Sequence, residues 1–220
     1  MKFQKYLNEG VNNAMVNTLL KCTDILREYR AKYKVFFRGY ATPKNADNFM
    51  TKMGRVESGR IPMSTSPIIH EYMNMEFYKK FGWPARNGVF VNANVRETYT
   101  YDRPYVFFPT NGFKYVWSAH VIDFYNSLPD NMLLDRTGPG EPRTLSDKGK
   151  EILDDMIRGY SDFGLHLALS RENEVMFNVK KYYMLSVRHP DFPDIMTELG
   201  LLPVAQAVYR TEHDEVPWKI

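Results

Sequence analysis

The chain has 220 residues, of which 44% are hydrophobic and 15% aromatic, and this composition excludes an intrinsically disordered chain because it is ample to build a buried core. The formal net charge is +3, from 29 Lys and Arg against 26 Asp and Glu, a weaker excess than nucleic-acid-binding domains usually carry. The single cysteine, Cys22, excludes an intrachain disulfide, and no apolar run reaches the roughly 18 residues that a membrane span needs.

The first part of the chain mixes helical and strand-like patterns. Apolar residues recur at helical spacing along residues 10–30, which predicts an amphipathic helix with Cys22 buried as a small hydrophobic side chain. Residues 34–40 predict a short buried strand that ends at a glycine, and residues 42–53 predict a turn followed by a short helix. No apolar leader segment opens the chain, so we expect a cytoplasmic protein, in the producing cell or in a target cell.

The rest of the chain continues this irregular mixture. Residues 61–67 predict a short strand, and residues 68–82 predict a helix that ends at a glycine. Residues 135–144, rich in Gly and Pro, predict an inserted loop, and Ser146 is the expected N-cap of a helix over residues 146–160. Further strands are predicted within residues 88–101, 112–128 (where a helix follows the strand), 175–187 and 204–210.

Short strands mixed irregularly with helices predict an α+β fold. The chain has no regular strand–helix alternation and no glycine-rich phosphate loop after a strand, so a doubly wound nucleotide-binding fold is not expected. We interpret residues 1–220 as one domain, with an N-terminal helical region (1–33), a core (34–188) and a C-terminal extension (189–220).

Metal and triad chemistry receive little support from the sequence. The histidines do not pair with one another at the spacing of metal ligands, and Cys22 is alone, so we expect no metal site. Spacing alone leaves a Ser–His–Asp triad open, but the chain has no G-x-S-x-G motif.

Two short motifs each allow a structural and a functional reading. Arg38 after an apolar strand either reaches solvent along its stem or is held at a cleft, where its planar fork suits a phosphate or carboxylate. Gly39 next to it would let a ligand approach the backbone. Ser64, Thr65 and Ser66 are either polar strand and cap residues or hydroxyl groups that serve a site.

Glu172 and Glu174 lie directly before a run of strand formers. Alternate residues of a strand project to the same face, so these carboxylates repel each other unless a cation lies opposite. One reading is a charged strand edge. The other, which we favour, is a site that handles a developing positive charge, such as the oxocarbenium-like state in which a glycosidic bond breaks.

Taken in order, the three motifs resemble the mono-ADP-ribosyltransferases of the branch with an Arg, Ser-Thr-Ser and Glu-x-Glu signature, found in bacterial toxins and bacteriophage enzymes. The segment ENEVMFNVKKYYMLSV is similar to the family's Glu-x-Glu segment and the strand after it, and MSTSPIIHEYMNMEFYKKFG is similar to its Ser-Thr-Ser strand and following helix. The resemblance covers residues 34–188. It implies a split pair of small, mostly antiparallel sheets around an NAD cleft, preceded by an N-terminal helix.

The resemblance also implies a role for each motif residue toward NAD, the co-substrate. Arg38 would neutralise the pyrophosphate and brace the nicotinamide ribose, and the backbone of Gly39 would meet the nicotinamide amide. Glu174 would hold the ribose 2′-hydroxyl and stabilise the oxocarbenium. Glu172 would face the acceptor and take a proton from it.

The hydroxyl motif and one aromatic ring complete the implied site. Ser64 would orient Glu174 by a hydrogen bond, while Thr65 and Ser66 would support the strand. The ring that stacks on nicotinamide is assigned to Phe77, with Phe81 and Tyr72 as the other candidates.

The implied activity is transfer of ADP-ribose from NAD to a protein side chain, with release of nicotinamide. The acceptor is expected to be an arginine, because the first glutamate of the motif commonly accompanies arginine acceptors in this family. Two alternatives stay open: an NAD glycohydrolase that gives ADP-ribose to water, and a non-catalytic NAD-binding or protein-binding module on the same fold. Neither a nucleic-acid acceptor nor a membrane partner is expected.

Overall fold

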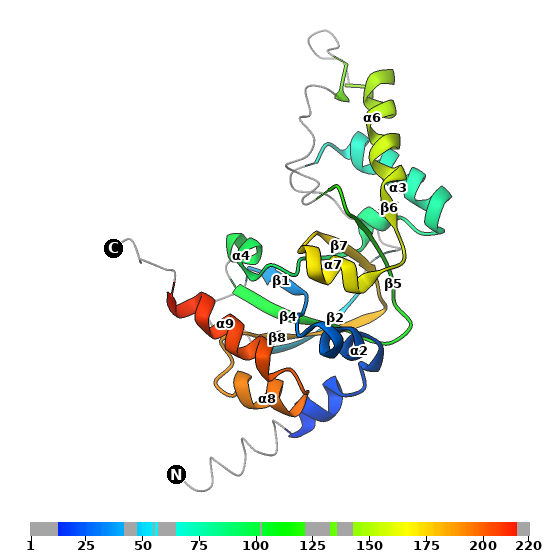
Figure 1. Cartoon of the computed structure of the whole chain (residues 1–220). Coiled ribbons are helices and arrows are strands. Elements are labelled where there is room, and N and C mark those ends of the chain that lie inside the picture. The colour runs from blue at the N-terminus through cyan, green and yellow to red at the C-terminus, as the bar shows by residue number, and fades with distance from the viewer. Residues whose placement is uncertain are drawn as a thin grey trace, which may run out of the picture. The chain divides into compact units, whose positions relative to one another are not determined.

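The computed structural model describes residues 13–41, 48–54, 56, 65–101, 103–121, 133–135 and 143–214. These residues form two compact units. Unit 1 takes its residues from the ranges 1–52, 92–112 and 181–220, and unit 2 takes its residues from 53–91 and 113–180. Each unit contains one four-stranded sheet and several helices, so the predicted α+β class with two small antiparallel sheets is confirmed (Figure 1). The domain boundaries expected from the sequence stay a prediction.

The sheet of unit 1 has the strand order β1-β4-β8-β2. Its strands are β1 (Phe37–Tyr40), β4 (Arg103–Pro109), β8 (Lys181–Ser186) and β2 (Phe49–Met53). The two central strands pair antiparallel, and β4 is almost wholly buried. Its apolar run Tyr-Val-Phe-Phe suits a strand covered on both faces.

Helices cover the sheet of unit 1. They are α2 (Thr23–Lys32), α4 (Val95–Thr98), η2 (Tyr99–Tyr101), α8 (Phe192–Glu198) and α9 (Leu202–Asp214). Tyr29 fixes α2 on β4: its hydroxyl donates to the carbonyl of Phe107 at 2.6 Å, and its ring packs edge-on against Phe36 and Phe108. Cys22, immediately before α2, is buried as predicted. The predicted helix over residues 10–30 is interrupted there, because residues 13–19 form a separate helix.

The sheet of unit 2 has the strand order β3-β7-β5-β6. Its strands are β3 (Val89–Val91), β7 (Val175–Asn178), β5 (Lys114–Ser118) and β6 (Tyr160–Ser161). The helices of this unit are α3 (Pro67–Phe81), η1 (Ala85–Asn87), α6 (Asp147–Arg158) and α7 (Leu165–Arg171). Both neighbours of β7 pair with it antiparallel. The strand that follows the two glutamates, β7, is therefore a central strand that pairs with a neighbour on each side.

Both long helices of unit 2 form where the sequence predicts them. Ile69, Met73 and Phe77 recur at i+4 spacing and are buried on one face of α3. Gly82 ends this helix in the left-handed conformation, with φ of 75°. Ser146 caps α6 by accepting a hydrogen bond from the N–H of Gly149 at 2.9 Å.

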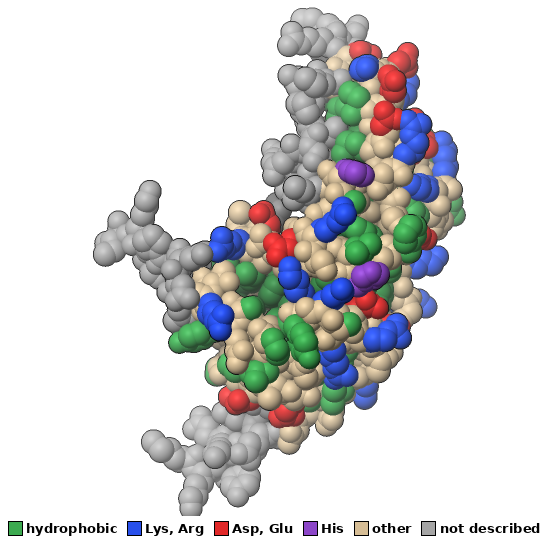
Figure 2. Space-filling view, in the orientation of Figure 1, with side chains coloured by type: hydrophobic (Ala, Val, Ile, Leu, Met, Phe, Trp, Pro, Cys, Tyr) green, Lys and Arg blue, Asp and Glu red, His purple; other side chains and the backbone are tan. Residues whose placement is uncertain are grey.

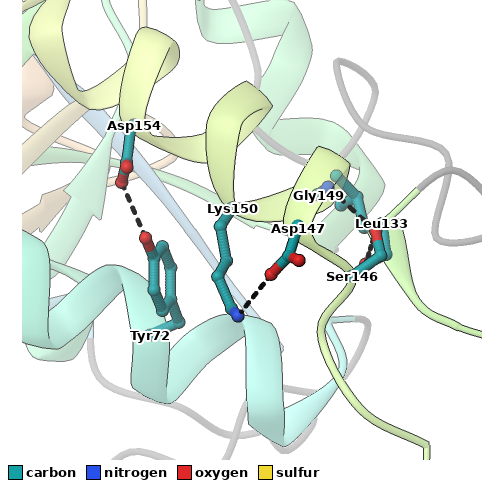
Figure 3. Close-up of polar contacts among 7 residues, drawn as sticks. All are labelled: Tyr72, Leu133, Ser146, Asp147, Gly149, Lys150 and Asp154. Atoms are coloured by element: carbon teal, nitrogen blue, oxygen red, sulfur yellow. Dashed lines mark hydrogen bonds and ion pairs between the residues drawn. The ribbon is translucent and has the colours of Figure 1, made fainter.

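Helix α6 makes polar contacts with α3 and with Leu133 (Figure 3). The hydroxyl of Tyr72 donates to Asp154 at 2.9 Å, and the hydroxyl of Ser146 donates to the carbonyl of Leu133. The ammonium of Lys80 satisfies the open end of the helix, donating to the carbonyl oxygens of Ile157, Arg158 and Tyr160. The outer face of α6 carries both signs of charge, as Figure 2 shows at the upper right.

The predicted strand over residues 175–187 is wrong as a single element. It divides into β7 and β8, which belong to different sheets. Gly54 lies at the division: its N–H donates to the carbonyl of Lys180 at 2.9 Å, and a Cβ on Gly54 would stand 1.6 Å from the carbonyl oxygen of Val179. The backbones of Gly54 and Val179 therefore lie very close together where β7 ends and β8 begins. Residues 175–187 contain no Gly or Pro, so the sequence gives no signal of this break.

Other predicted elements also change identity. Residues 204–210, predicted as a strand, belong to helix α9, because Val204, Ala205 and Val208 are buried at helical spacing. Residues 49–53, predicted within a short helix, form β2. The predicted strand over residues 88–101 keeps only β3 and then turns into α4 and η2. Most of the predicted loop at 135–144 and the predicted helix after β5 lie outside the described residues.

Tyr72 gives the contact between α3 and α6 a pH dependence. Burial and the neighbouring Asp154 raise the pKa of Tyr72 from 10.0 to about 12. Between these two pKa values the unfolded chain ionises at Tyr72 while the folded chain keeps the proton, so the free energy of unfolding falls as the pH rises. We expect Tyr72→Phe to remove this part of the decline between pH 10 and pH 12, measured by urea unfolding at stepped pH.

Tyr78→Phe is the matched control, because Tyr78 lies on the same helix with its side chain exposed. It should leave the decline as it is in the wild type. If Tyr72→Phe loses stability with rising pH as steeply as the wild type, the hydrogen bond from Tyr72 to Asp154 is not the cause of the decline.

Candidate functional site

Arg38 and Gly39 lie on β1, an edge strand of unit 1. In the antiparallel register Arg38 stands opposite Tyr105, and Tyr105 stands opposite Ser186 on the next strand. Residues directly opposite in antiparallel pairs project to the same face, so these three polar side chains form a row across the sheet. Arg38 is half-buried, whereas Tyr105 and Ser186 are fully buried. The row leads from the buried centre of the sheet to the guanidinium at its edge.

The hydroxyl motif is only partly described. Ser64 lies outside the described residues, while Thr65 and Ser66 precede α3 and are half-buried. Neither residue lies in a strand, in contrast to the prediction for residues 61–67. Ser66 occupies the predicted N-cap position of α3, but its side chain makes no capping hydrogen bond.

The aromatic candidates differ in accessibility. Phe77 is fully buried in the core of unit 2, where its ring packs edge-on against Tyr160 and stacks on Phe81. Tyr72 and Phe81 are half-buried. The assignment of the nicotinamide-stacking ring to Phe77 stays a prediction, and the two other rings expose more surface to a ligand.

The two glutamates lie between α7 and β7, not within the strand. Strand β7 begins at Val175, so the two glutamates lie directly before a strand as predicted, and the rule for alternate residues of one strand does not apply to them. Glu172 ends the helix, and Glu174 is the last residue before the strand. Both are half-buried, and the residue between them is almost completely buried.

Asn173 anchors this segment. Its side chain is directed inward, and its amide donates to the carbonyl of Ser118 at 2.6 Å, at the end of the neighbouring strand β5. Glu172 and Glu174 therefore lie on either side of a residue that is hydrogen-bonded to the end of β5. Sequence reasoning missed Asn173, because nothing in the sequence Glu-Asn-Glu shows that the asparagine is buried.

Glu172 has a left-handed backbone conformation, which is unfavourable for residues other than glycine. Its φ is 60° and its ψ is 28°, and among the described residues only Tyr33 shares a positive φ without being a glycine. The N–H of Glu172 donates to the carbonyl of Ala168 at 3.1 Å, which closes α7 in the way that glycine or asparagine usually does. A non-glycine residue in such a position is a reason to look for a function of its side chain.

A buried arginine faces Glu174. Arg86 Nη1 lies 3.8 Å from Glu174 Oε1, and the two side chains are 8% and 21% exposed. The guanidinium also covers the ring of Phe90, with Cζ 4.8 Å from the ring centroid. Arg86 thus places a positive charge opposite the second of the two carboxylates. Sequence reasoning missed Arg86, because it lies in the loop-like segment PARNG, far from the glutamates along the chain.

No family model matches the chain, and no curated protein or solved structure matches it either. Within the described ranges, no group of three or more His, Cys, Asp or Glu side chains is arranged to hold a metal ion. None of the helices in those ranges has the length and apolarity needed to cross a membrane. The site is therefore interpreted from its own geometry.

The left-handed conformation of Glu172 at the end of α7 predicts that a glycine variant is more stable than an alanine variant at this position. Glycine adopts a left-handed conformation without the steric penalty of about 1 kcal/mol that other residues meet there. We expect Glu172→Gly to raise the free energy of unfolding by about this amount relative to Glu172→Ala, which loses the same carboxylate but keeps the Cβ. Urea unfolding of the two variants measures the difference. Equal stabilities would show that the backbone at residue 172 is not held left-handed.

Proposed function

We propose that this protein transfers ADP-ribose from NAD to an arginine side chain of another protein and releases nicotinamide. The observation that carries the proposal is the segment Glu172–Glu174: its carboxylates flank an anchored Asn173, and the second of them is opposed by the buried Arg86. Such fixed negative charge suits a reaction in which positive charge develops on a sugar.

The reaction divides between the two carboxylates. The bond from the ribose C1′ to the nicotinamide nitrogen breaks, and nicotinamide leaves with the bonding electron pair as a neutral molecule. The positive charge passes to C1′ and the ring oxygen, where the carboxylate of Glu174 stabilises it. A guanidinium nitrogen of the acceptor then forms a bond to C1′ and loses one proton, which Glu172 accepts.

The other motif residues take supporting roles in this proposal. Arg38, half-buried on an edge strand, would bind the pyrophosphate, and the backbone of Gly39 would contact the nicotinamide amide. Ser64 would orient Glu174, with Thr65 and Ser66 next to it. The two small antiparallel sheets agree with the split-sheet fold that the resemblance implies. An NAD cleft is part of the proposal.

Glu174→Gln tests the catalytic assignment. The amide keeps the shape of the side chain but removes the negative charge that faces the oxocarbenium. We expect nicotinamide release to fall by on the order of 100-fold or more in a variant that still folds. Nicotinamide release from NAD, followed by chromatography, measures the rate. A variant that retains most of the NAD cleavage would refute the role of Glu174.

Glu172→Gln tests the division of labour. Water needs no guanidinium to be deprotonated, so loss of this carboxylate should suppress labelling of a protein acceptor and leave much of the slow hydrolysis of NAD. The ratio of transfer to hydrolysis should fall by on the order of tenfold or more. Acceptor labelling and nicotinamide release are measured in parallel. An equal fall in both, or no fall in either, would mean that the two glutamates do not have separate tasks.

A further inference from the structure

Arg86 is fixed in place from several sides within unit 2. Its backbone N–H donates to Asn74 Oδ1 at 2.9 Å, which ties η1 to the middle of α3. Its guanidinium covers the ring of Phe90 on β3, a strand that pairs with β7. The arginine therefore links α3 to β3, the neighbour of the strand that follows Glu174.

A partly buried polar cluster on α3 and η1 supports the backbone of Arg86. Asn74 Nδ2 donates to Asn87 Oδ1 at 2.9 Å, and Asn87 Nδ2 donates to the carbonyl of Val56 at 3.2 Å. His70 Nε2 lies 3.0 Å from Asn87 Oδ1 and 3.1 Å from Asn74 Nδ2. A protonated Nε2 donates to the first and a bare Nε2 accepts from the second, so the bond between the two asparagines holds in either tautomer.

The charge pair has little value for stability by itself. Taking two charges out of water offsets most of their attraction, so a buried ion pair is often replaceable by apolar side chains without loss. At 3.8 Å, moreover, the contact is longer than a hydrogen bond. The cluster around Arg86 is thus better explained by what the arginine does to Glu174 than by the stability of the unit.

We propose that Arg86 is a positioning residue for Glu174: it holds the carboxylate, by its charge and from a fixed backbone, in the place where it meets the nicotinamide ribose. This inference rests on the proposed function. Arg86 is 7% exposed and does not bind NAD itself, in contrast to the half-buried Arg38. Loss of Arg86 therefore lowers the rate of the chemical step and leaves NAD binding unchanged.

The kinetic test compares Arg86→Met, which removes the charge at similar length, with Arg86→Lys, which keeps it. We expect kcat for nicotinamide release to fall by on the order of tenfold to 100-fold in Arg86→Met, because a displaced catalytic group loses its alignment. The KM for NAD, and the affinity in calorimetric titration, should stay within about twofold of the wild type, as expected for a group that acts only on the chemical step. Arg86→Lys should recover part of kcat.

The control is Arg158→Met, which removes an exposed arginine at the end of α6 in the same unit. It should leave kcat and KM as in the wild type. If Arg86→Met matches the wild type in kcat, or if it weakens NAD binding as strongly as it slows cleavage, the positioning role is overturned while the proposed function stands. A wild-type protein that releases no nicotinamide overturns the proposed function itself.

A second measurement is independent of activity. In thermal unfolding, Arg86→Met should lower the Tm, because it removes a positive charge from beside the half-buried carboxylate of Glu174. Adding Glu174→Gln to that variant removes the carboxylate and should raise the Tm again, above that of Arg86→Met alone. Additive effects of the two substitutions would show that Arg86 does not act on Glu174 and would overturn the inference even in an active enzyme.

Discussion

The charge of Glu174 opposite the buried guanidinium of Arg86 is the contact on which the interpretation of this protein depends. Two carboxylates so close along the chain repel each other, and the arginine next to them in sequence, Arg171, is exposed at the end of α7. The fold supplies a buried arginine from η1, which is bonded to α3 through Asn74. The helix α3, the strand pair β3–β7 and the Glu-x-Glu segment thus act as one assembly, in which packing fixes an arginine and the arginine opposes a glutamate.

The segment Glu172–Glu174 contains a backbone conformation that is unfavourable for stability. Glu172 ends α7 in a conformation that glycine would adopt more easily. Features of this kind lower stability slightly, and they persist where a side chain is needed for another purpose. They also keep the carboxylates out of the sheet, because β7 starts only at Val175 and its pairings engage residues after the motif.

The sequence predicted those parts of the fold that depend on local rules. Helices α3 and α6 have apolar residues at i+4 spacing and clear end signals, and both formed as expected. The long run after Glu174 and the segment Val204–Arg210 also contain residues that suit a strand, but the first divides between two sheets and the second packs as a helix. The sequence did not predict the role of Arg86, because its partner Glu174 is remote in the chain. It did not predict the left-handed conformation of Glu172, because a glutamate gives no signal for that conformation.

The central claim is that this protein moves ADP-ribose from NAD to a protein side chain. The most direct measurement is incubation of the wild-type protein and of Glu174→Gln with labelled NAD and a cell lysate, followed by mass spectrometry of the modified side chains. The account predicts ADP-ribose on arginine side chains of lysate proteins with the wild type and almost none with the variant. Absence of any modified side chain, together with intact NAD after incubation with the wild type, would contradict it.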